Sequence, residues 1–233
     1  KPIRILSGSI VNGSYKFDNK NKGLLGHQGF DHFHFRLDSI YGDVANLYIY
    51  KDTVELFGQH IQAYYAHSDF KVHDLNTHFR YTKHSLEFHE IDTKVGNSYL
   101  KDDLVFSFGS MSDFQQFNKK VQIRADLDST SINTKDLALF APALKKVNDQ
   151  WTAYGKVKGT VADFESENFA FYFGKSSKII GKLDVENLPN ISETYMELDF
   201  KKSALYPKDL KKYFGAPQSV KTLEKFGEIR FSS

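Results

Sequence analysis

The chain has 233 residues, and 15% of them are aromatic, with 21 Phe and 13 Tyr but a single Trp. A formal net charge of +2 argues against nucleic acid as the main partner, because phosphate binding requires a concentrated basic face. The absence of cysteine excludes disulfides and thiolate metal sites. The sequence also contains no run of about 20 apolar residues, which is the length that a helix needs to cross a bilayer.

Alternating apolar and polar residues predict antiparallel strands along most of the chain. In residues 31–38, Phe33, Phe35 and Leu37 alternate with polar side chains, a period typical of half-buried antiparallel strands. About a dozen such stretches, separated by turn residues, indicate a long meander. Between residues 43 and 65 the pattern does not decide which face is buried, because tyrosines alternate with aliphatic residues.

Two stretches depart from this alternation and predict helices. Residues 133–149 and 207–227 carry apolar side chains at helical spacing, and each stretch contains an Ala-Pro step. Because proline suits the first turn of a new helix, we expect each stretch to form a short helix, a break and a second helix.

The two helical stretches also define an internal repeat. The sequence TKDL at 134–137 matches PKDL at 207–210 at an offset of 73 residues, and an alternating strand precedes each of them. Units of this kind stack along the chain, each burying the apolar face of its neighbour, which predicts an elongated molecule.

Residues 155–200 resemble the repeat region of AsmA-like, TamB-type envelope proteins. The resemblance lies in the motif G-x-V-x-G-T, an aromatic strand (FAFYFG) that ends in glycine, the motif N-L-P-x-I, and a following K-D-L helix. The layout of the preceding strands is similar, so the resemblance extends over most of residues 28–214. The chain does not begin with Met and has no signal-like segment, and we expect it to be an internal piece of a longer protein.

This resemblance implies a mainly β fold, in which an elongated antiparallel sheet curls into an open groove and carries two short helical pairs. Residues 1–120 would form the N-terminal part of the groove, and residues 121–233 the repeat units of the same continuous domain. The implied protein is a periplasm-spanning component of lipid transport and outer-membrane assembly, anchored in the inner membrane of a Gram-negative envelope. Its partners would be phospholipid and an outer-membrane β-barrel protein of the BamA/TamA-like kind, and membrane contact would come from regions absent from this chain.

In this interpretation the apolar residues of the repeat region line the groove. Acyl chains need a continuous apolar surface that makes no hydrogen-bond demands, and alternating strands supply one. The expected lining residues are Val121, Ile123, Leu127, Val157, Val161, Phe169, Phe171, Phe173, Leu183, Val185, Met196, Leu198 and Phe200.

Several alternatives remain open from the sequence. The alternating face could instead be the core of an ordinary sandwich or barrel, and the chain could be a scaffold that docks on barrel proteins by sheet-edge pairing.

All nine histidines lie between His27 and His89, which raises a metal site at His32 and His34 as an alternative to a solvated face. No catalytic motif is present, so we expect no enzyme and no cofactor, although aromatic faces with acidic neighbours also occur in glycan-binding proteins. The lysine-rich end, 201–230, is expected to be a solvated surface or a contact for anionic lipid headgroups or an acidic partner.

Overall fold

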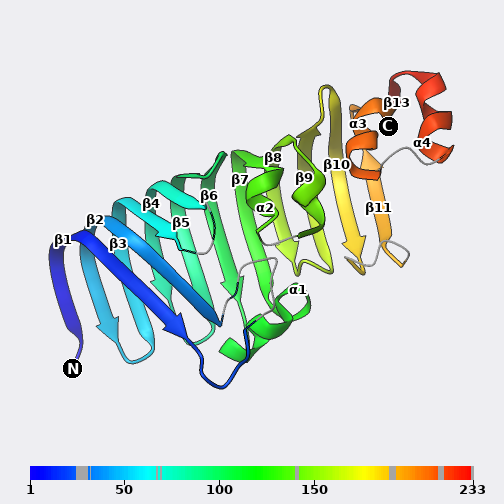
Figure 1. The fold of residues 1–233 in the computed structure, drawn as a ribbon. Coiled ribbons are helices and arrows are strands. Elements are labelled where there is room, and N and C mark those ends of the chain that lie inside the picture. Colours follow the sequence, from blue (N-terminus) through cyan, green and yellow to red (C-terminus); the bar gives the residue numbers. More distant parts are fainter. Residues whose placement is uncertain are drawn as a thin grey trace.

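A single open antiparallel sheet forms the body of the protein (Figure 1). The computed structural model describes residues 1–24, 31, 33–66, 68, 70–139, 142–188, 193–214 and 218–231. The strands are β1 (Ile3–Asp18), β2 (His34–Tyr50), β3 (Thr53–Tyr65), β4 (Lys71–Tyr81), β5 (Ser85–Val95), β6 (Ser98–Ser107), β7 (Gln122–Asn133), β8 (Gln150–Gly159), β9 (Phe164–Phe173), β10 (Ser177–Glu186), β11 (Tyr195–Phe200), β12 (Ser203–Leu205) and β13 (Ile229–Phe231).

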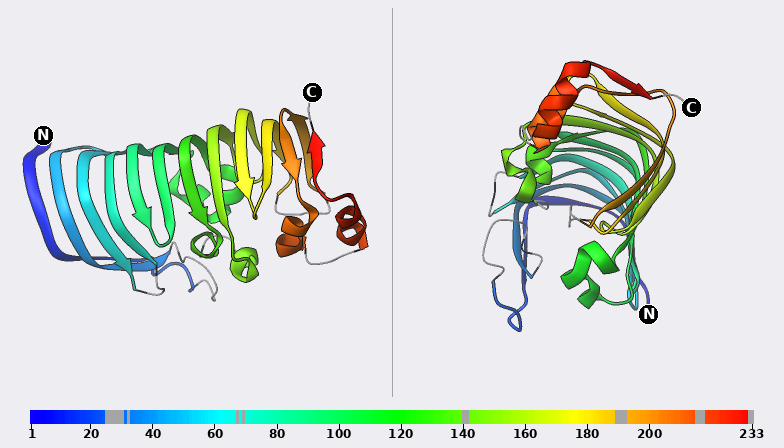
Figure 2. Two further views of the ribbon diagram at one scale, coloured as in Figure 1. Left: turned by 90° about the horizontal axis from the view of Figure 1, so that it is seen from above. Right: turned by 90° about the vertical axis from the view of Figure 1, so that its right-hand side faces the viewer.

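The strands follow one another across the sheet in chain order. Each strand from β1 to β9 pairs with the next one, β10 pairs with both β11 and β12, and β12 pairs with β13. The long meander that the alternation predicts is therefore confirmed. The expected fold class, an elongated antiparallel sheet that curls without closing into a barrel, is also what the structure shows (Figure 2).

The curvature of the sheet coincides with irregularities in the middle of its strands. The register shifts within the pairs β1–β2, β3–β4 and β5–β6, and Asn12, His60 and Glu90 lie at these shifts with positive φ angles. Such β-bulges bend a strand and increase its local twist. Similar shifts in the other long pairs lie close to Ser39, Ser129, Gly155 and Gly181, which also have positive φ. Bulges in successive strands therefore bend the sheet along its whole length.

The helices are short and lie at the two margins of the curved sheet (Figure 2, right). They are η1 (Met111–Gln116), α1 (Phe117–Lys120), α2 (Thr134–Leu137), η2 (Pro142–Lys146), α3 (Pro207–Phe214), α4 (Gln218–Leu223) and η3 (Glu224–Phe226). The two predicted helix–break–helix segments thus correspond to α2 with η2 and to α3 with α4. The segment η1–α1 is a third helical unit that the sequence pattern did not predict.

The molecule exposes an unusually large surface. Its accessible area is 14,569 Å², whereas a compact monomer of this mass exposes about 11,000 Å². The single curved layer accounts for the difference, because the described residues include no second sheet packed against the first.

Candidate functional site

A continuous row of apolar side chains crosses one face of the sheet from β1 to β11. Residues paired directly across neighbouring strands point to the same face, so the register of the strand pairs defines the row. Its members are Ile3, Ile49, Val54, Tyr81, Leu86, Phe106, Ile123, Gly159, Phe164, Val185 and Met196. A second row on the same face runs from β3 to β8 through Leu56, Phe79, Phe88, Leu104, Ala125 and Val157.

This apolar face is the concave one, and we call it the trough. The ring of Phe117 in α1 lies 5.8 Å from that of Phe106, and the ring of Tyr213 in α3 lies 5.7 Å from that of Phe173. Both helices therefore contact the apolar face, and α1 lies on the inner side of the curve (Figure 2, right). The same register settles the face of residues 43–65, because Ile49 points into the trough and Tyr48 points outward beside Glu55.

The side chains of the trough are only partly covered. In the first row Val185 is buried, at 3% exposure, while Ile3 and Met196 at the sheet edges are 54% and 59% exposed. The other side chains of this row are half-buried. In a sandwich the opposing sheet would bury the same positions, so the single layer leaves a long apolar surface in contact with solvent.

Most of the predicted lining residues lie on this face. They are Ile123, Leu127, Val157, Phe169, Phe171, Leu183, Val185, Met196, Leu198 and Phe200. The rings of Phe169, Phe171 and Phe173 stack along β9 at 5.8 and 5.5 Å.

Three of the predicted residues are placed differently. Phe173 is on the trough face but is covered by α3. Val121 has no exposed surface and joins α1 to β7 in the chain, outside both elements. Val161 lies in the turn between β8 and β9 and not on a strand.

Sequence reasoning did not select the N-terminal half of the trough. In the two rows, strands β1 to β6 contribute ten apolar side chains and strands β7 to β11 contribute six. The signal was present, because stretches such as TVELF and SLEF alternate with the same period. Which of the two faces of these strands was concave became clear only from the cross-strand register.

Aspartates anchor the helices of one margin to the hairpin turns of the sheet. We call this margin, which carries α2, η2 and α3, the α2/α3 margin. Asp136 in α2 accepts hydrogen bonds from the Asn97 amide at 2.8 Å and the Ser98 hydroxyl at 2.6 Å, in the β5–β6 turn. Asp209 in α3 accepts them from the β9–β10 turn, including the Lys175 amide at 2.9 Å. Burial opposes ionisation, but these donors lower the pKa of Asp209.

A second buried aspartate fixes α3 at the same margin of the trough, where Tyr213 contacts Phe173. Asp149 accepts hydrogen bonds from the Gly174 amide at 2.7 Å and from the Tyr213 hydroxyl, and it pairs with Lys212 at 3.1 Å. The indole of Trp151 in turn donates to the Tyr213 oxygen at 2.8 Å. These polar contacts hold the aromatic ring of Tyr213 against the trough.

The opposite margin carries η1 and α1, and we call it the α1 margin. Lys22, in the connection after β1, donates to the side-chain oxygen of Gln115 in η1 at 3.2 Å. The β1–β2 connection belongs to the α2/α3 margin. The strands alternate in direction, so the start of β2 lies on the same side of the sheet as the β5–β6 turn, which α2 contacts. This bond therefore spans the mouth of the trough.

The convex face is polar. The row beside the first apolar row contains Arg4, Tyr48, Glu55, Arg80, Glu87, Val105, Arg124, Lys158, Glu165, Asp184 and Glu197. Opposite charges on neighbouring strands stabilise a sheet and keep its outer face hydrated. Along these adjacent rows the trough side is apolar and the outer side is mainly charged.

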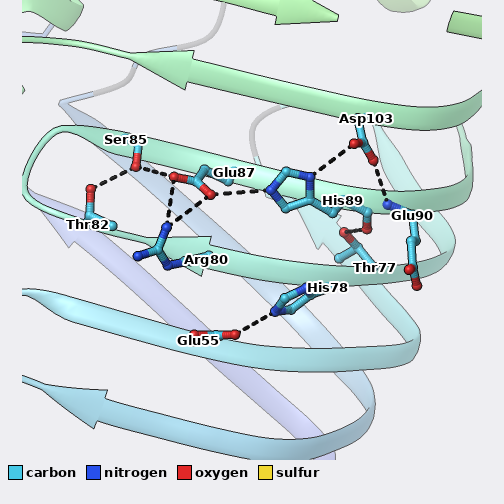
Figure 3. Close-up of polar contacts among 10 residues, drawn as sticks. All are labelled: Glu55, Thr77, His78, Arg80, Thr82, Ser85, Glu87, His89, Glu90 and Asp103. Carbon is cyan, nitrogen blue, oxygen red and sulfur yellow. Dashed lines mark hydrogen bonds and ion pairs between the residues drawn. The ribbon is translucent and has the colours of Figure 1, made fainter. Parts of the chain in front are cut away.

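His89 is the centre of a polar network on this outer face (Figure 3). Its Nδ1 lies 3.1 Å from Asp103 and its Nε2 lies 3.3 Å from Glu87, so each ring nitrogen faces a carboxylate. Only the doubly protonated ring can donate to both. Burial opposes this charge, but the hydrogen bonds to Asp103 and Glu87 raise the pKa of His89. Asp103 also accepts from the amide of the bulge residue Glu90 at 2.9 Å, so the network fixes the β5 bulge.

The other histidines do not converge on a metal site. Within the described ranges, no group of three or more His, Asp or Glu side chains is placed to bind a metal ion. His34 bonds to Asp31 at 3.2 Å, while His32 lies outside the described residues. In the same ranges, no helix is long and apolar enough to cross a membrane.

Comparisons with protein-family models, with characterised proteins and with solved structures found no match to this chain. The function is therefore argued from the geometry of the trough and its margins.

Proposed function

We propose that this chain shields the acyl chains of phospholipids in the trough and lets them slide along it. The chain would act as a periplasm-spanning component of lipid transport and outer-membrane assembly, as its resemblance to TamB-type proteins suggests. The passive movement of an apolar chain along an apolar lining needs no covalent step, so the proposed role is not enzymatic and uses no cofactor.

The continuity of the apolar row from β1 to β11 carries this proposal. Each strand pair places an apolar side chain, or Gly159, next to the previous one, and most of these side chains remain half-exposed. Covering such a surface is favourable by about 25 cal/mol per Å² of apolar area. The backbone amides and carbonyls are used in the sheet ladder, so a ligand meets side chains that demand no hydrogen bonds.

Lipid extraction from the purified chain tests the proposal. Mass spectrometry of the organic extract is expected to find phospholipid on the parent, and much less on the Phe171→Asp variant. The matched control is Tyr172→Asp, at the next residue of β9, because Tyr172 faces outward and is 39% exposed. Folding of both variants is checked by circular dichroism. No lipid on the folded parent, or equal losses in the two variants, would contradict the proposal.

The open edge at β1 favours a second candidate function, a scaffold that pairs its sheet edge with an outer-membrane β-barrel protein. All but one of the 16 residues of β1 are exposed, and Leu6 is 81% exposed. An exposed edge strand offers unpaired amides and carbonyls to an incoming strand. This function predicts that Leu6→Pro abolishes binding to the barrel while Phe171→Asp does not, the reverse of what lipid shielding predicts for lipid content.

A further inference from the structure

The α2/α3 margin is rich in lysine. Its helical segments and turn (133–139, 142–149, 174–176 and 206–214) contain seven lysines and three aspartates. Lys211 pairs with Glu224 and Lys212 pairs with Asp149. The other five are exposed, and no ion pair with them occurs among the described residues; they are Lys135, Lys145, Lys146, Lys175 and Lys208. We call these five residues the lysine margin.

The aspartates of this margin do not neutralise the lysine margin. Asp136 and Asp209 are turned towards the hairpin turns, and Asp149 is turned towards Gly174 and Lys212. Asp149 and Asp209 are buried, at 8% and 4% exposure. The aspartate carboxylates therefore bind groups within the margin, whereas the ammonium groups of the lysine margin remain exposed to water.

The same contacts group the lysines. The carboxylate of Asp209 binds the amide of Lys175, and Lys208 is its neighbour in the chain. The backbones that carry these two lysines are therefore adjacent. Lys135 holds the equivalent position next to Asp136 in the first repeat, so a lysine recurs where each helix is fastened to a turn.

These charges lie next to the apolar lining. Tyr213, in the helix that carries Lys208, packs against Phe173 and lies 6.0 Å from the ring of Trp151. The α1 margin has a different balance, because three acidic residues accompany Lys119 and Lys120 of α1 there. They are Asp113 in η1, Asp163 in the β8–β9 turn and Glu186 at the end of β10. The trough is therefore bordered by unpaired positive charge on one side and by mixed charge on the other.

We propose that the lysine margin binds the phosphate headgroup of an anionic phospholipid whose acyl chains lie in the trough. This inference rests on the proposed function and adds an orientation and a lipid class to it. An ammonium group attracts a phosphate through charge and hydrogen bonds, and each lysine near an anionic lipid surface contributes about 1 kcal/mol. The headgroup stays in water at the margin while its chains cover the apolar rows.

A competition between two lipids tests this inference. The chain is incubated with vesicles that contain equal amounts of phosphatidylglycerol and phosphatidylcholine, repurified, and its bound lipids are quantified by mass spectrometry. We expect an enrichment of phosphatidylglycerol of about threefold or more on the parent. In a variant with Lys145→Gln, Lys146→Gln, Lys175→Gln and Lys208→Gln, the total lipid should be unchanged and the enrichment should disappear.

A matched variant separates the margin from net charge. Lys51→Gln, Lys83→Gln, Lys119→Gln and Lys120→Gln change four exposed lysines on the α1 margin and alter the charge equally. This variant should keep the enrichment. An equal loss of the enrichment in both variants, or lipid bound to the parent without preference, would contradict headgroup binding by the lysine margin. Neither result would contradict the binding of acyl chains in the trough. A parent that carries no lipid overturns both proposals, and binding to vesicle surfaces without extractable lipid assigns the lysines to a membrane contact instead.

Discussion

Asp209 of α3 holds the β9–β10 turn in the way that Asp136 of α2 holds the β5–β6 turn, 73 residues earlier in the chain. In each case the carboxylate accepts a backbone amide and a serine hydroxyl, from Asn97 and Ser98 or from Lys175 and Ser177. The repeated K-D-L motif therefore has a structural purpose. It fastens a short helix, with its lysine, to the margin of the trough.

Removing the charge of Asp209 should loosen α3. Asp209→Asn leaves three backbone amides and the Ser177 hydroxyl with a weaker acceptor, and we expect a loss of about 1–3 kcal/mol in the free energy of unfolding. Urea denaturation measures this loss, and limited proteolysis should show earlier cleavage in 207–226. The matched control is Asp184→Asn, an exposed aspartate on the convex face, which should change stability by less than about 0.5 kcal/mol. Equal effects would contradict the anchoring role.

Stability should also fall in acid because of the same carboxylate. The pKa of Asp209 is lowered in the folded protein although burial opposes this. Its contribution is therefore present above the pKa of the unfolded chain and lost as the pH falls through the lower, folded value. Unfolding measured between pH 7 and pH 3 should show a steeper decline for the parent than for Asp209→Asn. Parallel curves would show that Asp209 contributes nothing to acid sensitivity.

Alanine substitutions at three glycines distinguish the free-energy cost of a steric clash from the cost of a strained backbone conformation. Gly174 has φ of 65°, and a Cβ atom there would lie 2.2 Å from the Asp209 carboxyl carbon. Gly227 has φ of 66° but open space around it, and Gly8 has neither constraint. We expect Gly174→Ala to destabilise most, Gly227→Ala by about 1 kcal/mol, and Gly8→Ala little. Thermal unfolding of the three variants gives the order, and a Gly174→Ala no worse than Gly227→Ala would contradict the close contact with Asp209.

His89 should make stability depend on pH near neutrality. Its pKa is raised in the folded state by Asp103 and Glu87, against the effect of burial. The contribution is therefore complete below the unfolded pKa of about 6.5 and is lost as the pH rises through the folded value. Relative to His89→Gln, the parent should lose up to about 1 kcal/mol as the pH rises from 5.5 to 8.5. His73→Gln is the control, since His73 is exposed. The same pH dependence in both variants would rule out the His89 network as its source.

The two-residue period predicted the sheet and the division of its faces, because that period follows from the geometry of an extended strand alone. Phe169, Phe171 and Phe173 share one face for this reason. The bulges were not predictable, since residues such as His60 and Glu90 adopt positive φ only to meet a shifted partner strand. The curvature, and with it the concave side, depends on those long-range pairings.

The site was predictable only in part for similar reasons. Helix α1 has just four residues and joins a six-residue η1, too short for a helical period to stand out against alternating strands. The use of Asp209 as a turn anchor could not be predicted either, because its partner turn lies more than 30 residues earlier in the chain. The repeated K-D-L motif indicated that the aspartate has a role in both repeats, and its hydrogen bond to the hairpin turn explains that role.

Site-specific photo-cross-linking would test the central claim, that lipid lies in the trough, most directly. Leu56 and Phe57 are neighbours in β3; Leu56 pairs with Phe79 in the trough, and Phe57 pairs with His78 on the convex face. Each is replaced in turn by p-benzoylphenylalanine, the chain is loaded with phospholipid, and the irradiated protein is analysed by mass spectrometry. The account predicts lipid adducts at position 56 and none above background at position 57. Equal adducts at both positions, or adducts at position 57 alone, would contradict it.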